Sequence, residues 1–265
     1  IKEIIEVLEI AKSMHKPVIV HARTVKGKGY KIAEGQHEHW HGVGPFNVED
    51  GEFIKKSAEK SATSVFSDAL LKLACKYENI VGVTAAMPSG TGMDKLIKEF
   101  PNRFWDVAIA EQHAITSMAA MAKEGFKPFV TIYSTFLQRG FDQIIHDVCI
   151  MNLPVVFAMD RAGIVGNDGE THQGAFDISF LRFIPNMVLF APRDNETLKY
   201  SLDFAYSLNS PCAIRYPRGA FSKLDFQSSK FELGKSELLK NGTSNKLFIG
   251  YGSGVRKAIE VEKLH

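Results

Sequence analysis

The sequence predicts an α/β protein with an open, mostly parallel β-sheet and helices on both faces. Its strand-like segments are short, continuous apolar runs, which are typical of strands buried on both faces. They alternate with segments of helical periodicity, as in sheets whose strands are joined by crossover helices. Of the 265 residues, 45% are hydrophobic and 23% are charged, which is the composition of a globular protein. Disordered chains, collagens and small disulfide scaffolds are therefore excluded.

The first region of the chain contains little of this pattern. Apolar residues at helical spacing predict an amphipathic helix at residues 1–15, and a β-branched run predicts a strand at residues 17–22. Residues 26–51 are rich in glycine, histidine and polar side chains and have no period, so they predict a long loop. The loop ends in a linker near residues 44–56.

The second region, residues 59–222, carries the sheet. A helical stripe of apolar side chains starts after Ser61, and Gly125 is the expected stop of a later helix. Residues 223–265 begin a third region. The remaining predicted elements are strands at residues 79–84, 103–109, 128–133, 154–159, 187–190 and 211–216, and helices at residues 114–123, 136–151 and 196–208.

Charge and cysteine content narrow the function classes. Lysine and arginine total 32 against 30 acidic residues, a net charge of +2, and no basic block indicates binding to nucleic acid or a membrane surface. No apolar run approaches the roughly 18 residues of a membrane span, and no signal peptide is seen. The three cysteines, Cys75, Cys149 and Cys212, have no CxxC spacing. We expect buried, reduced thiols and a cytoplasmic location.

Polar residues gather where four of the predicted strands end. In open parallel sheets, ligands bind just beyond the carboxyl ends of the strands. These ends are followed by residues 110–113, 133–139, 160–174 and 215–219, which are dense in charged and polar side chains. The third of these segments is unusually long for a connection in an α/β unit, and long loops there are often functional.

Each residue in these clusters also has an ordinary structural interpretation. Glu111 alone could simply favour the positive end of a helix, and Phe136 alone could belong to the core. Single histidines and arginines are more often structural or surface residues than ligands. The histidines and arginines concerned are His113, His172, Arg161, Arg215 and Arg218.

Taken together, the motifs resemble those of one enzyme family. Residues 106–113 (DVAIAEQH), 133–139 (YSTFLQR) and 160–177, together with residues 26–30 (KGKGY) and 41–46 (HGVGPF), are similar to motifs of the 1-deoxy-D-xylulose-5-phosphate synthases. This family depends on thiamine diphosphate and belongs to the transketolase-like group. The resemblance covers nearly the whole chain.

The resemblance implies how the cofactor's pyrimidine ring is held. In this group a glutamate hydrogen-bonds a ring nitrogen of the aminopyrimidine and favours the imino tautomer, whose exocyclic nitrogen removes the thiazolium C2 proton. Glu111 matches that position, and the cofactor then carries the carbanion chemistry. Phe136 matches the aromatic residue that stacks on the pyrimidine ring.

The resemblance also implies the substrates. The family decarboxylates pyruvate and joins the two-carbon unit to D-glyceraldehyde 3-phosphate, giving 1-deoxy-D-xylulose 5-phosphate and CO2, the first step of the non-mevalonate isoprenoid pathway. The acceptor phosphate calls for arginines. The matching residues are Arg161 and Arg218 for the phosphate, Tyr133 and Arg139 for neighbouring substrate positions, Asp168 and His172 for orientation and proton transfer, and His41 for a histidine over the reactive centre.

One part of the family pattern is absent from this sequence. The Gly-Asp-Gly motif with a downstream asparagine, which holds Mg²⁺ and the diphosphate, is not found, so we expect no metal ligands here. The resemblance assigns residues 1–58 to the tail of the diphosphate-binding domain and linker, 59–222 to the pyrimidine-binding domain, and 223–265 to a linker and the start of the transketolase C-terminal-like domain. We therefore expect a piece of a homodimeric synthase that is inactive alone.

Two alternatives remain at this point. One is another thiamine-diphosphate enzyme, either a transketolase or the β subunit of a 2-oxoacid dehydrogenase, which shares the glutamate and the pyrimidine-binding domain. The substrates would distinguish these enzymes: pyruvate with glyceraldehyde 3-phosphate for the synthase, against a ketose phosphate donor or lipoamide for the others. The other is a non-catalytic module of the same fold, although the intact set of polar site residues argues against a loss of chemistry.

Overall fold

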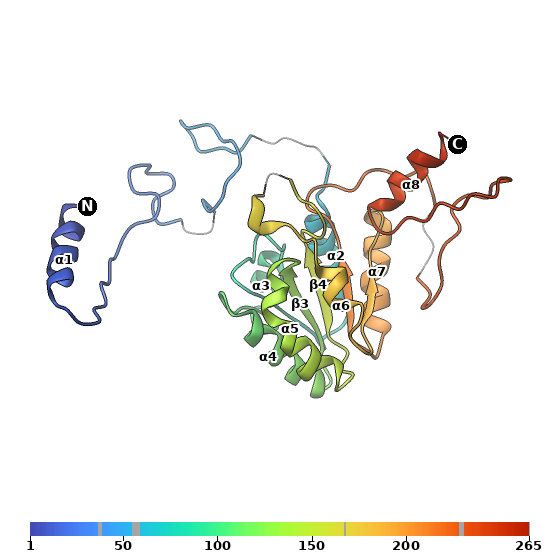
Figure 1. Ribbon diagram of the computed structural model, residues 1–265, viewed down its shortest axis with the longest axis horizontal. Helices are drawn as coiled ribbons and strands as arrows, with labels where there is room; N and C mark the ends of the chain where they lie inside the picture. Colours follow the sequence, from blue (N-terminus) through green and yellow to red (C-terminus); the bar gives the residue numbers. More distant parts are fainter. Residues whose placement is uncertain (37–38, 55–58, 167, 228–230, 265) are drawn as a thin grey trace. The chain divides into compact units, whose positions relative to one another are not determined.

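The computed structural model describes residues 1–36, 39–54, 59–166, 168–227 and 231–264 (Figure 1). Parts of the predicted loop and linker of the first region, and residue 167 of the long polar loop, lie outside the described residues. The chain forms two compact units, Ile1–Ala58 and Glu59–His265, and each is described by itself.

The first unit contains one helix and a small aromatic cluster. Helix α1, Lys2–Ser13, confirms the predicted helix. The strand predicted at residues 17–22 is wrong, because this segment has no neighbouring strand and Ile19 is 95% exposed. Further along, the Trp40 ring lies 4.7 Å from the Phe46 ring and 5.4 Å from the Phe53 ring, measured between centroids.

The second unit contains a six-stranded sheet in the order β2-β1-β3-β4-β6-β5. Every adjacent pair of strands is parallel, which confirms the predicted fold class. Strand β2 lies on one side of β1 and β3 lies on the other, because the chain adds strands first on one side of β1 and then on the other. The strands are β1 Ile80–Thr84, β2 Phe104–Asp106, β3 Lys127–Tyr133, β4 Val156–Asp160, β5 Val188–Phe190 and β6 Cys212–Arg215.

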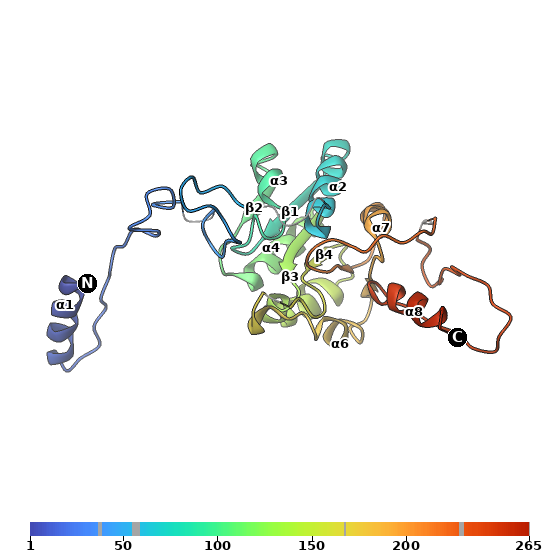
Figure 2. The same cartoon turned by 90° about the horizontal axis from the view of Figure 1, so that it is seen from above.

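Helices cover both faces of the sheet, as Figure 2 shows for α2 and α3 on one side and α6 on the other. Alternate strand residues enter two separate cores. One core joins Phe129 of β3 to helices α2 and α7, and the other joins Val130 of β3 to helix α4 and the segments that follow it. The helices are α2 Ala62–Lys76, α3 Asp94–Glu99, α4 Glu111–Lys123, α5 Phe141–Gln143, α6 Asp177–Leu181, α7 Asn195–Ser207 and α8 Gly254–Glu262.

Several elements differ from the prediction. The strand expected at residues 103–109 ends at Asp106, because Ala108 has a φ of 56°, which an extended strand excludes. The single helix expected at residues 136–151 is divided into a 3₁₀ segment η1, Phe136–Gly140, the short α5, and a π-helical segment η2, Ile144–Cys149. The short helices α3 and α6 and the 3₁₀ turn η3, Glu170–His172, were not predicted.

The prediction of three buried thiols is wrong for one cysteine. Cys75 is exposed on α2, whereas Cys149 and Cys212 are buried. Burial raises the pKa of each of these two thiols to about 12, so they are neutral and inert near neutral pH. In the part of the chain that the structure describes, none of the helices has the length and apolar character needed to span a bilayer.

Candidate active site

The carboxyl ends of the strands form one edge of the sheet. Parallel register places the last residues of adjacent strands side by side: Thr84 of β1 opposite Asp106 of β2, and Tyr133 of β3 opposite Asp160 of β4. The loops that leave these ends carry the side chains predicted for the site. The topology therefore brings together segments that lie far apart in the sequence.

Glu111 is the first residue of α4, at the helix N-terminus; the helix begins three residues before the predicted start at residue 114. Its side chain is buried, and its Oε2 atom has no hydrogen-bond partner among the described residues. Arg139 Nη1 lies 3.0 Å from Oε2 as an ion pair, but the angles are not those of a hydrogen bond. The partial positive charge of the helix N-terminus favours a carboxylate there. A ring nitrogen could still bind at Oε2.

The segment η1 packs directly against the start of α4. A Cβ atom at Gly140 would lie only 2.1 Å from Ile115 Cδ1 and 3.6 Å from the Glu111 carbonyl oxygen, so the two backbones approach closely because position 140 has no side chain. This approach places Arg139 next to Glu111.

Three rings form an aromatic cluster beside the Glu111–Arg139 ion pair. The rings of Tyr133 and Phe136 are nearly parallel, with centroids 5.8 Å apart and an interplanar angle of 14°. The His172 ring meets the Phe136 ring edge-on at 5.2 Å. Phe136 is only partly buried, so its ring could stack on a planar heterocycle.

Asp168 bridges two of the predicted arginines. Its Oδ2 atom lies 3.1 Å from Arg161 Nε and 3.4 Å from Arg218 Nε. The Arg161 guanidinium also lies over the Tyr133 ring, with Cζ 3.8 Å from the ring centroid. Burial raises the pKa of Tyr133, which keeps its hydroxyl protonated. Arg161 also contacts the Asp160 carboxylate at 3.1 Å, so two carboxylates offset the two guanidinium charges, and the suitability for an anionic ligand rests on the N–H donors of the arginines.

The structure thus brings eight predicted residues of the second unit to one edge of the sheet. These are Glu111, Tyr133, Phe136, Arg139, Arg161, Asp168, His172 and Arg218, the last of which is joined to the others through Asp168. His113, which had only a structural interpretation, is exposed on α4. His41 belongs to the first unit, where its Nδ1 atom lies 2.7 Å from Lys26 Nζ.

Sequence reasoning missed two residues that support this cluster. Asp160 is fully buried at the end of β4 and contacts Arg161, and Thr63 of α2 donates a hydrogen bond to Asp160 Oδ2. The position of Asp160 as the last residue of a buried strand, directly before Arg161, was the available signal. Nothing in the sequence around Thr63 indicated this contact.

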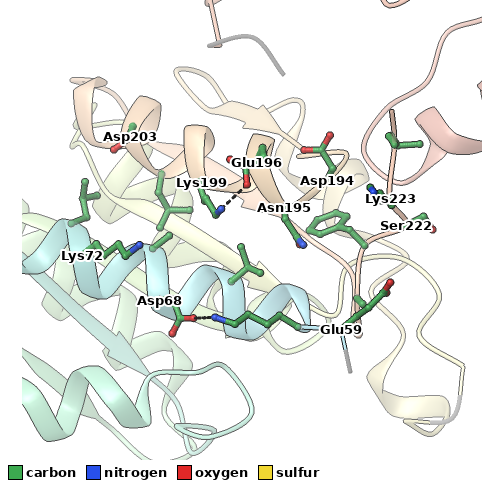
Figure 3. Close-up of a pocket in the computed structure, with 18 of the residues that line it drawn as sticks. Glu59, Asp68, Lys72, Asp194, Asn195, Glu196, Lys199, Asp203, Ser222 and Lys223 are labelled. Atoms are coloured by element: carbon green, nitrogen blue, oxygen red, sulfur yellow. Dashed lines mark hydrogen bonds and ion pairs between the residues drawn. The ribbon is translucent and has the colours of Figure 1, made fainter. Parts of the chain in front are cut away.

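A groove of the second unit lies away from the candidate site. It has a volume of about 800 Å³ and runs between α2, α7 and residues 220–226, as Figure 3 shows. None of the predicted site residues lines it. Its charged side chains pair with one another, for example Lys60 with Asp68 at 2.9 Å and Lys199 with Glu196 at 2.6 Å. Across the described ranges, no group of three or more His, Cys, Asp and Glu side chains could hold a metal ion.

Comparison with known proteins gives consistent similarities. Residues 58–223 match the family model described as the transketolase pyrimidine binding domain. All 265 residues are 83% identical to a protein of Aliarcobacter butzleri named 1-deoxy-D-xylulose-5-phosphate synthase, and 64% identical to one of the same name from Sulfurimonas denitrificans. The chain spans 44% of the length of each of these curated relatives.

A solved structure has a similar fold. It is described as a split gene transketolase, an inactive β4 tetramer, and it matches with a TM-score of 0.69 at 27% sequence identity. The match covers 78% of this chain and 68% of the other.

Proposed function

Because this chain belongs to the transketolase pyrimidine-binding domain family, we propose that it supplies the pyrimidine-binding half of a thiamine-diphosphate site in a 1-deoxy-D-xylulose-5-phosphate synthase. The observation that carries the proposal is the buried Glu111 at the N-terminus of α4, whose Oε2 atom lacks a hydrogen-bond partner in the described structure. Arg139 Nη1 at 3.0 Å offsets the charge of this oxygen but does not donate a hydrogen bond to it, and a buried acceptor without a donor is costly unless a ligand supplies one.

The proposed reaction is that of the longer protein. It decarboxylates pyruvate and joins the remaining two carbons to D-glyceraldehyde 3-phosphate, giving 1-deoxy-D-xylulose 5-phosphate and CO2. The 83% identity to a synthase over the whole of this chain supports this assignment. The first residues of α4 and the loop after β4, which carry several of the candidate site residues, lie within the matched length.

Glu111 and Phe136 would hold the cofactor's pyrimidine ring. Glu111 Oε2 would share a proton with a ring nitrogen, and the Phe136 ring would stack on the heterocycle. When bound, thiamine diphosphate supplies the carbanion chemistry. Arg139, whose Nη1 lies 3.0 Å from Oε2, would keep the carboxyl group in place.

The two arginines and their neighbours would bind the substrates. Arg161 and Arg218 would bind the acceptor phosphate, with Tyr133 supporting the Arg161 guanidinium from below at 3.8 Å. Asp168 and His172 would orient the donor and acceptor and hold or move protons. His41, from the first unit, is proposed to reach the reactive centre in the complete protein.

The rest of the site would come from outside this chain. We assign residues 1–58 to the tail of the diphosphate-binding domain and the linker, and residues 223–265 to a linker and the start of the C-terminal-like domain. Mg²⁺ and diphosphate ligands would lie in the remainder of the diphosphate-binding domain, and a second copy would complete a homodimer. The inactive β4 tetramer of a split transketolase supports the expectation that this chain alone does not turn over.

The test is the substitution Glu111→Gln in the complete protein that contains this chain. We expect the rate of product formation from pyruvate and D-glyceraldehyde 3-phosphate to fall by about 100-fold or more, because a proton-transfer role is removed. Glu124→Gln, at the exposed opposite end of α4, is the matched control and should keep full activity. Retained activity in Glu111→Gln, or robust turnover by the isolated 265-residue chain, would contradict the proposal.

A further inference from the structure

Three residues at the carboxyl edge have a left-handed backbone conformation although they are not glycine. Ala86, Ala108 and Arg161 have φ values of 59°, 56° and 58°, and each lies one or two residues beyond the end of a strand. In each case the backbone N–H donates a hydrogen bond to Oδ1 of a strand-terminal aspartate. Asp106 accepts from Ala86 and Ala108, and Asp160 accepts from Arg161. Strained backbone is often retained at functional sites.

Asp160 holds Arg161 at both its backbone and its side chain. The Oδ1 atom of Asp160 accepts the Arg161 backbone N–H at 2.7 Å and lies 3.1 Å from Arg161 Nη1. Its other oxygen, Oδ2, accepts a hydrogen bond from the Thr63 hydroxyl at 2.5 Å. Because Asp160 is 0% exposed, water does not compete for these contacts.

These contacts fix the direction of the Arg161 guanidinium group. Arg161 Nη1 also donates to the carbonyl oxygen of Gly90 at 2.7 Å, and Nε donates to Asp168 at 3.1 Å. The plane of the guanidinium therefore stays over the Tyr133 ring. An arginine that must bind a phosphate with two parallel hydrogen bonds gains from such preorganisation, because less side-chain freedom is lost on binding.

We propose that Asp160 is a positioning residue for the acceptor phosphate, acting through Arg161, and that Thr63 supports it. This inference rests on the function proposed above. It assigns Asp160 no contact with substrate. It predicts an effect on recognition of the phosphate group and none on the chemistry of the donor.

The experiment compares two acceptors in the complete protein that contains this chain. In Asp160→Asn, the KM for D-glyceraldehyde 3-phosphate should rise about tenfold, as expected for the loss of one charge-assisted contact. The kcat should stay within about threefold of the parent, and the KM for unphosphorylated D-glyceraldehyde should not change. In an Arg161→Met background, Asp160→Asn should have no further effect on the preference for the phosphorylated acceptor.

Asp177→Asn is the matched control. Asp177 is equally buried, accepts the backbone N–H of the following residue at 2.8 Å, and pairs with Arg215 at 3.0 Å, but it has no place in the proposed site. It should be destabilised to a similar degree and should keep its preference for the phosphorylated acceptor. Equal loss of that preference in both variants would overturn the proposal.

Two further measurements distinguish a loss of phosphate recognition from a failure to fold and from a failure of the proposed function. If Asp160→Asn does not fold, Thr63→Val should give the same selective rise in KM by about threefold, because it removes one hydrogen bond to Asp160. No change in Thr63→Val would overturn the proposal. Stabilisation by inorganic phosphate, measured as a shift of the unfolding midpoint, should be smaller in Asp160→Asn than in Asp177→Asn. If inorganic phosphate shifts the unfolding midpoint of the parent but the parent makes no product, the proposed function fails. The comparison of Asp160→Asn with Asp177→Asn in phosphate then still tests the role of Asp160.

Discussion

Among single residues, Asp160 is the one whose environment most opposes its charge. Burial raises its pKa to about 6, although Arg161 and the Thr63 hydroxyl favour the charged form. The hydroxyl of Tyr216 is also buried near it without a hydrogen-bond partner in the described structure, and burial raises the pKa of that hydroxyl well above its usual value. The carboxylate is therefore kept at a cost in stability, which is expected where a charged group serves recognition.

The raised pKa gives a pH dependence of stability. Since the folded state binds the Asp160 proton more tightly than the unfolded state, the contribution of Asp160 is full below its unfolded pKa of about 3.9 and is lost as the pH rises through about 6. The stability of the parent relative to Asp160→Asn should therefore be greater near pH 4.5 than near pH 7. Urea unfolding of both proteins at the two pH values measures this. A difference that grows with pH would contradict the prediction.

Among the elements, the loop after β4 is closed at its base by backbone hydrogen bonds, and it carries three of the candidate site residues, Arg161, Asp168 and His172. Gly163 and Gly174 exchange backbone hydrogen bonds of 2.8 Å in both directions. A Cβ atom at Gly174 would lie 2.3 Å from the Arg161 carbonyl oxygen and 2.6 Å from Ser134 Oγ. Only glycine allows this approach, which places Asp168 and His172 above the edge of the sheet.

Gly174→Ala should therefore destabilise the protein by about 1–3 kcal/mol, because the backbone of Arg161 must move to admit a methyl group. Denaturant unfolding measures the change. Gly254→Ala is the control, since a Cβ atom at Gly254 in α8 meets nothing within 4 Å, and it should leave stability unchanged or slightly raised. Equal stability of Gly174→Ala and the parent would show that the close approach is not maintained in solution.

At the scale of the whole molecule, the two compact units are stabilised by different contacts. The second unit has two apolar cores on either side of its sheet. In the first unit, α1 has no buried residue, and the remaining order comes from the rings around Trp40. Cooperative stability should therefore reside in the second unit.

Removing residues 1–58 should leave the thermal unfolding midpoint of the remaining chain within about 3 °C of the parent, because little apolar surface of the first unit is buried. Differential scanning calorimetry of the two chains checks this. A much larger drop in the midpoint would show that the first unit contributes to the folding of the second.

Much of the fold could be predicted from the sequence. Apolar runs such as residues 154–159 indicated buried parallel strands, and the structure has a strand at Val156–Asp160. The candidate residues after these strands could also be found, because a parallel sheet directs every strand end to the same edge. The division of the segment at residues 136–151 into 3₁₀, α and π parts was not predicted, because its apolar residues fit the spacing of a single helix.

The sequence by itself determined the class of fold, because periodicity depends on neighbours along the chain. It also predicted that polar residues gather at the carboxyl edge of the sheet, and the resemblance of its motifs to one enzyme family supplied the candidate site residues. The tertiary structure decided the strand order, the bridge from Asp168 to Arg161 and Arg218, and the hold of Asp160 on Arg161. Thr63 meets Asp160 across 97 positions of sequence, and only the packing of α2 against the sheet brings them together.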